Sequence, residues 1–82
     1  MEQRYVVYVL KSLKTGKRYV GQTSNLEKRL KDHNSGLSVY TKNRGPWKLV
    51  FQEYYNSRSE AMLREKYLKT GKGRDFLDTL GK

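Results

Sequence analysis

The sequence predicts an α/β (α+β) domain in which a small three-stranded sheet, mixed or antiparallel, is flanked by helices. The predicted order is β-β-α-β-α, with a further α-helix at the end. Three runs of β-branched and aromatic residues are typical of strands, and two capping boxes each precede a helical pattern. A length of 82 residues fits one domain, which we expect to span 1–82.

The first two strands are expected to form a hairpin. Tyr5–Leu10 is apolar on both faces, which is typical of a central strand covered on each side. Leu13–Lys17 has the composition of a turn in which Gly16 takes a positive φ. Arg18–Gln22 returns as the second strand.

A first helix is predicted to follow the hairpin, from about residue 25 to residue 33 or 34. Ser24 and Glu27 have the spacing of a capping box, with the serine as the cap. Gly36 stands where it would end the helix. The order of these signals therefore gives the helix both a start and a stop.

This helix is expected to turn a cation and an imidazole toward the sheet. Leu26 and Leu30 lie four residues apart and define its apolar face. His33 lies about one turn beyond Leu30 on the same face, and Arg29 lies at the edge of that face. His33 could serve a site or simply pack against the sheet.

The third strand is predicted at Trp47–Tyr55, after a polar loop. Ser57 and Glu60 then form the second capping box, which opens a helix running to about residue 69. Gly71 and Gly73 are expected to end that helix. A short last helix is predicted over residues 75–80.

The second helix is predicted to be covered on two sides. One side carries a carboxylate, Glu65, inside an apolar stripe made of Ala61, Met62 and Leu68. Leu63 and Tyr67 lie on the other side. A buried, unpaired carboxylate costs several kcal/mol, so we expect Glu65 either to serve a site or to form an ion pair with Arg29 or a lysine.

The charge balance points to a polyanion. Lys and Arg number 18 against 8 Asp and Glu, a formal net charge of +10, and both halves of the chain carry the excess. Without cysteines, no disulfide or zinc-thiolate site is expected, and one histidine excludes a multi-histidine metal site. The longest apolar run, Tyr5–Leu10, is too short to cross a bilayer. We expect a cytoplasmic protein with no membrane partner and no small-molecule cofactor.

Several motifs together resemble the GIY-YIG nuclease superfamily, and above all its small, stand-alone, single-domain bacterial members. The first motif is Val6–Tyr8, and the second is Tyr19–Gly21 with an arginine, Arg29, ten residues after its tyrosine. The stretches 19–30, 40–42 and 59–65, the last with Lys69, are also close. The resemblance implies the family's three-stranded fold, similar to the nuclease domains of phage homing endonucleases and of the excision-repair incision subunit.

The resemblance also implies a role for each site residue. As catalytic residues it gives Tyr8, Tyr19, Arg29, His33 and Glu65. Tyr19 would be the base, Arg29 would contact the scissile phosphate, and Glu65 would hold one divalent ion, Mg²⁺ or Mn²⁺. The partner implied is nucleic acid, with DNA favoured over RNA and repair or recombination as the setting, and a DNA-bound fraction would associate with the nucleoid.

Basic side chains other than the catalytic candidates are expected to form a phosphate track or simply a solvated face. They are Lys28, Lys31, Tyr40, Lys42, Arg44 and Lys48, with Tyr40 included as an aromatic that could stack on a base. Trp47 could stack in the same way or belong to the core. No long apolar stripe is left over, so we expect a monomer or a weak oligomer.

Three departures from the family pattern keep a second function open. Val6 replaces the first motif's glycine, Gln22 stands where some repair-type members have lysine, and Leu77 occupies the place of an asparagine that many members carry. The alternative is a non-catalytic nucleic acid-binding module or an accessory subunit of a repair complex. The intact set of two tyrosines, arginine and glutamate favours the nuclease.

Overall fold

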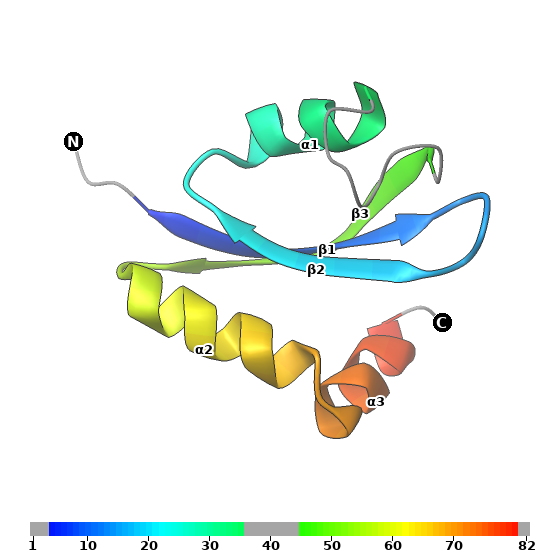
Figure 1. Cartoon of the computed structure of the whole chain (residues 1–82). Coiled ribbons are helices and arrows are strands. Elements are labelled where there is room, and N and C mark those ends of the chain that lie inside the picture. Colours follow the sequence, from blue (N-terminus) through cyan, green and yellow to red (C-terminus); the bar gives the residue numbers. More distant parts are fainter. Residues whose placement is uncertain (1–3, 36–44, 81–82) are drawn as a thin grey trace.

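The computed structural model describes residues 4–35 and 45–80, and its elements follow the predicted order with the third helix present (Figure 1). Gly36 and its predicted role as a helix stop lie outside the described residues. The six elements are β1 (Tyr5–Ser12), β2 (Arg18–Thr23), α1 (Leu26–Ser35), β3 (Trp47–Tyr55), α2 (Arg58–Leu68) and α3 (Gly71–Leu80).

The sheet is antiparallel, with strand order β2-β1-β3. β1 is therefore the central strand, as its two apolar faces predict. Tyr8 pairs with Gly21 of β2 on one side and with Gln52 of β3 on the other. The β1–β3 register shifts between Val9 and Leu10.

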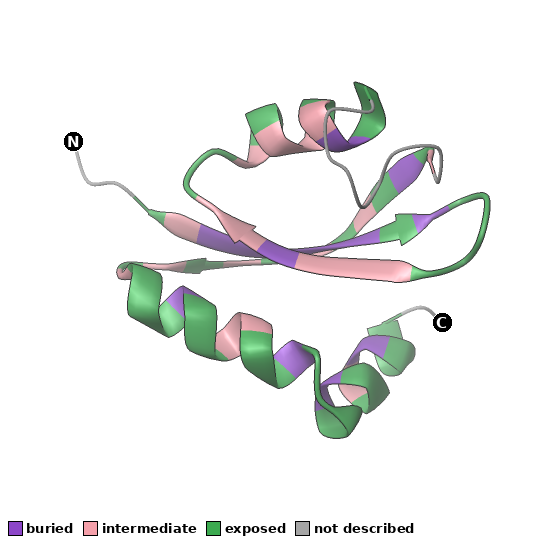
Figure 2. Ribbon diagram, viewed as in Figure 1, coloured by how far each residue is buried: buried purple, intermediate pink, exposed green. Residues whose placement is uncertain are grey.

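Helices cover both faces of this sheet, α1 on one and α2 with α3 on the other (Figure 1). Alternate residues of β1 consequently enter two separate cores, and the strand forms the most deeply buried stretch of the chain (Figure 2). On the α1 face the buried residues are Val6, Tyr8, Leu10 and Trp47. On the α2–α3 face they are Val7, Val9, Ala61, Leu68 and Leu77.

The β1–β2 turn is held by one buried hydroxyl. The Oγ atom of Ser12 accepts hydrogen bonds from the backbone N–H groups of Lys14 and Thr15 at 3.1 and 2.9 Å. Gly16 has a φ of 77°, which confirms the predicted left-handed position. The turn therefore satisfies its own backbone donors.

The N-cap of α1 is Asn25, and the prediction of Ser24 is wrong. The Oδ1 atom of Asn25 accepts from the N–H of Lys28 at 3.1 Å, and the Oγ1 atom of Thr23 accepts from the N–H of Asn25 at 3.0 Å. Asparagine caps a helix as well as serine does. The strand-to-helix bend therefore falls one residue later than the sequence pattern indicates.

The C-terminal turn of α1 is tied to the start of β3. The N–H of Trp47 donates to Oδ1 of Asn34 at 2.8 Å, and Nδ2 of Asn34 donates to the carbonyl of Trp47 at 3.4 Å. Trp47 is buried on the α1 face. Its ring thus belongs to the core, which is one of the two roles that the sequence allows, and does not stack on a base.

α2 is covered on one side only. Its predicted cap is confirmed, because Oγ of Ser57 accepts from the N–H of Glu60 at 3.3 Å. Leu63 and Tyr67 are exposed to 69 and 39%, so the predicted second covering is wrong for the described residues. Met62, predicted to lie in the covered stripe with Ala61 and Leu68, is also exposed, to 47%. The sheet reaches only the face that carries Ala61 and Leu68, which are buried.

α3 begins four residues earlier than predicted, so that Gly71 and Gly73 lie inside it. α2 ends before these glycines. At its end the N–H of Lys69 donates to the carbonyl of Lys66, and the N–H of Thr70 donates to the carbonyl of Tyr67. Gly73 lets α3 pack tightly on this corner, since a Cβ there would lie 2.7 Å from the carbonyl carbon of Leu68.

Candidate functional site

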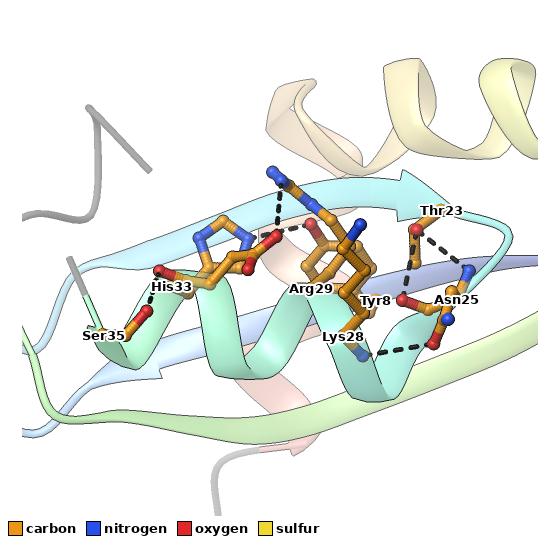
Figure 3. A network of polar contacts seen from close by, with 8 residues as sticks. Tyr8, Thr23, Asn25, Lys28, Arg29, His33 and Ser35 are labelled. Atoms are coloured by element: carbon orange, nitrogen blue, oxygen red, sulfur yellow. Dashed lines mark hydrogen bonds and ion pairs between the residues drawn. The ribbon is translucent and has the colours of Figure 1, made fainter. Parts of the chain in front are cut away.

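Tyr8 is the buried centre of the candidate site. It projects from the middle of β1 on the α1 face and is only 1% exposed. Its hydroxyl is 3.0 Å from Nε2 of His33, which comes from α1 and is equally buried (Figure 3). The first motif therefore lies against α1, and His33 faces the sheet, as the apolar face of the predicted helix indicates.

Gly21 makes room for the Tyr8 ring on the neighbouring strand. A Cβ at this position would lie 2.7 Å from the Tyr8 hydroxyl oxygen and 3.0 Å from Cε1 of Tyr19. Real Cβ atoms do not approach so closely, so a side chain here would displace one of the tyrosines. The glycine of the second motif thus has a packing reason that the sequence alone does not reveal.

Tyr19, on β2, completes an aromatic group on this face. Its ring centroid is 6.2 Å from that of Tyr8 and 4.8 Å from that of His33, with both pairs tilted. Unlike those two, Tyr19 is half-buried. Its side chain is therefore the member of this group that a bound molecule can reach.

Arg29 borders the group from α1 and is partly open to solvent. Its Nη1 atom is 3.6 Å from Oδ2 of Asp32, and its side chain is 36% exposed (Figure 3). A side-chain hydrogen bond with Tyr8 is the main cause that raises the pKa of Arg29. The guanidinium thus lies between Asp32 and the Tyr8 hydroxyl, with donors left for a ligand.

Tyr8 and His33 are both kept neutral. Burial raises the pKa of Tyr8, although the hydrogen bond with Arg29 opposes this. Burial also lowers the pKa of His33, and the nearby charge of Arg29 lowers it further. These states fit a Tyr8 oxygen that accepts from Arg29, which can only donate, and a Tyr8 hydroxyl that donates to Nε2 of neutral His33.

We expect this histidine to make the protein less stable in mild acid. Because the folded pKa of His33 lies below the ordinary 6.5, the unfolded chain binds more protons between these two values. The stability is fully present above 6.5 and is lost as the pH falls through 6.5 toward the folded pKa. Thermal melting between about pH 7.5 and 5.5 measures the loss.

The matched variant for this test is His33→Gln, which keeps a polar side chain but does not titrate. It should melt at a lower temperature than the wild type at pH 7.5, yet with a flatter dependence on pH. An equally steep dependence in both proteins would show that other groups cause the loss.

Glu65 lies on α2, and α2 covers the opposite face of the sheet from α1 (Figure 1). Its Oε2 atom is 2.8 Å from Nζ of Lys69, with side-chain exposures of 23 and 55%. Of the ion pairs that the sequence allows for Glu65, with Arg29 or with a lysine, the structure therefore shows the one with a lysine. The carboxylate nevertheless lies near enough to the tyrosines for its charge to contribute to the raised pKa of Tyr8.

The structure therefore gathers four of the five predicted catalytic residues into one group and places the fifth on the helix that covers the opposite face of the sheet. Tyr8, Tyr19, Arg29 and His33 share the α1 face, while Glu65 stands on the helix of the other face. Within residues 4–35 and 45–80, no group of three His, Asp or Glu side chains is arranged to hold a metal ion. A metal at Glu65 would thus have one protein carboxylate.

Three members of the predicted phosphate track are among the described residues, and all three are exposed. Lys28 and Lys31 are exposed on α1, and Lys48 is exposed on β3. The remaining candidates, Tyr40, Lys42 and Arg44, lie outside the described residues. The sequence did not identify Asp32 or Gly21 as site residues. The spacing of three residues from Arg29 to Asp32 is the signal that could have indicated Asp32.

None of the described helices has the length and apolar content needed to cross a bilayer. The chain is 50% identical over 64 residues to the UPF0213 protein CPE1444 of Clostridium perfringens, covering 77% of this chain and 68% of the relative. It is 46% identical over 68 residues to the UPF0213 protein SH2523 of Staphylococcus haemolyticus, covering 82% of each.

A solved structure agrees with the fold. The solution NMR structure of the UPF0213 protein BH0048 from Bacillus halodurans superposes with a TM-score of 0.58 at 35% identity, covering 94% of this chain and 84% of that one. The profile of the GIY-YIG catalytic domain matches residues 4–76, a range that includes all five predicted catalytic residues. The chain therefore belongs to the GIY-YIG family, whose domain is of the nuclease type, and is a small bacterial-type member similar to the UPF0213 proteins.

Proposed function

We propose that this protein is a metal-dependent endonuclease that hydrolyses phosphodiester bonds in nucleic acid, with DNA as the substrate. The observation that carries the proposal is the network on the α1 face. Buried Tyr8 bonds to His33, Arg29 lies close enough to Tyr8 for the tyrosine to raise the pKa of Arg29, and Tyr19 packs beside them with part of its side chain accessible. A DNA repair or recombination role, with association with the nucleoid, belongs to the same proposal.

Arg29 is proposed to bind the scissile phosphate. The transition state of phosphodiester hydrolysis gathers negative charge on the non-bridging oxygens, and a guanidinium can meet two of them with parallel hydrogen bonds. Asp32 and Tyr8 hold this side chain from two sides. Such positioning before the substrate arrives lowers the reorganisation needed during the reaction.

Tyr19 is proposed as the base that accepts a proton from the attacking water. Tyr8 and His33 are too deeply buried to touch a substrate, so we assign them positioning roles. His33 fixes the Tyr8 hydroxyl, and that hydroxyl fixes Arg29. This refines the sequence prediction, in which all of them were catalytic residues.

Glu65 is proposed to hold the divalent ion. Magnesium is commonly bound through one or two carboxylates, with waters and substrate phosphate completing the shell, so a single half-buried carboxylate fits. When bound, such an ion supplies Lewis-acid stabilisation of charge on the phosphate oxygens. Lys69 would have to leave the carboxylate, which is inexpensive because a partly exposed pair contributes only about 0.2–1 kcal/mol.

The test is a cleavage assay on labelled duplex, single-stranded and branched DNA, with Mg²⁺, with Mn²⁺ and with a chelator. Wild-type protein should cut only with metal, and Glu65→Gln should lose at least about 10²-fold in rate because the neutral amide binds the ion poorly. Glu60→Gln is the matched control on the same helix, since glutamine also serves a capping box. Full activity of Glu65→Gln would refute the proposed metal role.

The second candidate is a nucleic acid-binding module without catalysis. Its supporting observation is the ion pair that neutralises Glu65 with Lys69. In that case Arg29 and Tyr19 would contact phosphate and base without any reaction. Binding that is unaffected by metal, with no cleavage of any of the three DNA forms, would favour this candidate.

A further inference from the structure

A groove of about 900 Å³ lies beside the site, between the hairpin end of the sheet and the α2–α3 corner. Figure 1 shows the β1–β2 turn and α3 at the same end of the molecule. Tyr19 is the residue of the four-membered group on the α1 face that also lines this groove. Its volume lies in the range of about 300–1,000 Å³ that is typical of ligand pockets.

The walls of the groove are strongly basic. Cations line it from both sides, Lys11, Lys17 and Arg18 from the hairpin and Lys69 and Arg74 from the helical corner. One carboxylate, Asp78, lines it as well and is paired with Arg18 at 2.8 Å. Among the described residues Lys11, Lys17 and Arg74 have no ion pair, so their charges are available to an anionic ligand.

The floor of the groove is apolar. Val20, Leu68 and Leu77 contribute the part that belongs to the core of the α2–α3 face. Val50 and Leu80 extend it outward, with exposures of 38 and 44%. A ligand that fits must therefore carry anionic groups and also a flat or apolar surface.

The groove and the candidate site are connected around the edge of the sheet. β2 is an edge strand, with the Tyr8 group on one of its faces and the groove on the other. Tyr19 lines both, and Lys69 of the groove wall is paired with Glu65. Tyr19 and Lys69 are therefore the residues at which the groove adjoins the candidate site, Tyr19 directly and Lys69 through its ion pair with Glu65.

We infer that this groove binds unpaired nucleotides of the nucleic acid strand that is cleaved, next to the scissile phosphodiester. The inference rests on the proposed function for the identity of the neighbouring site. A duplex offers phosphates to the outside but keeps its bases stacked inside, so it would leave the apolar floor unused. An unpaired nucleotide satisfies both surfaces, with phosphates at the cations and a base against the floor.

The test measures binding of a labelled single strand and of a duplex by fluorescence anisotropy, without metal. In the double variant Lys17→Gln/Arg74→Gln, both positions are exposed, so the fold should survive. Single-strand affinity at about 50 mM salt should fall roughly tenfold or more, and the salt dependence should flatten by about 0.7 per lost cation. The matched control, Arg58→Gln/Lys66→Gln, removes the same charge from exposed positions of α2 away from the groove.

A second variant tests the floor separately. Val50→Thr keeps the side-chain shape but makes it polar, so single-strand affinity should fall roughly threefold while the salt dependence stays unchanged. The inference is overturned if the groove variants bind like the control, or if duplex binding falls as much as single-strand binding. Groove-dependent binding by a protein that cuts nothing would instead refute the nuclease and retain the groove.

Discussion

Arg29→Ala is expected to lower the rate of DNA cleavage by about 10³-fold or more, the range seen when an arginine that meets a transferring phosphoryl group is removed. The physical reason is the position of the side chain. Its guanidinium is 36% exposed but held by Asp32 and Tyr8, so it can bind a phosphate without first losing much freedom. Initial rates at saturating DNA and metal measure the effect.

Arg29→Lys separates charge from geometry. Lysine keeps the positive charge but cannot make two parallel hydrogen bonds, so its rate should lie between those of the wild type and Arg29→Ala. Arg58→Ala, at an exposed position of α2, removes one arginine far from the site and should cut normally. Equal rates for the wild type and Arg29→Ala, with both proteins folded, would rule out this role for Arg29.

Gly73→Ala is expected to have the largest effect on stability, a loss of about 3 kcal/mol or more. The new methyl group would meet the backbone of Tyr67 and Leu68, and backbone cannot move aside as a flexible side chain can. α3 would have to lift away from the α2 corner. A domain of this size has roughly 4–12 kcal/mol in total, so urea unfolding should show a large shift of the midpoint.

Gly71→Ala is the matched control two residues earlier in the same helix. Nothing lies within 4 Å of a Cβ at this position. Alanine should therefore leave stability unchanged or raise it by up to about 1 kcal/mol, since it favours a helix over glycine. A Gly73→Ala protein as stable as Gly71→Ala would contradict the tight packing of α3.

The sequence predicts the elements that carry strong local signals and fails where packing decides. β1 and the cap at Ser57 are confirmed, because strand propensity and capping chemistry are local properties, although the same capping pattern at Ser24 misplaces the cap by one residue. Gly71 and Gly73 resemble a helix stop, yet both lie inside α3, where Gly73 allows close packing and Gly71 faces open space. Leu63 looks like a core residue, but no element of the described chain covers that side of α2.

The candidate site is predictable in its members but not in its arrangement. The resemblance to the GIY-YIG family names Tyr8, Tyr19 and Arg29, and the fold brings them together on one face. The burial of Tyr8 and His33 comes from β1 lying in the middle of the sheet, which no motif records. For Glu65 two kinds of ion-pair partner are possible from the sequence, Arg29 or a lysine. A spacing of four residues on a helix permits the contact with Lys69 without requiring it.

The central position of β1 also sets the order in which the protein can fold on the ribosome. β1 is made before β2 and β3, and its hairpin with β2 needs only the chain up to Thr23. Its other edge pairs with β3, and that pairing ends at Tyr55. Until then a row of backbone donors and acceptors on the most apolar strand stays open, which is a hazard for aggregation. The hairpin forms early, but the nascent protein is protected only when β3 has emerged.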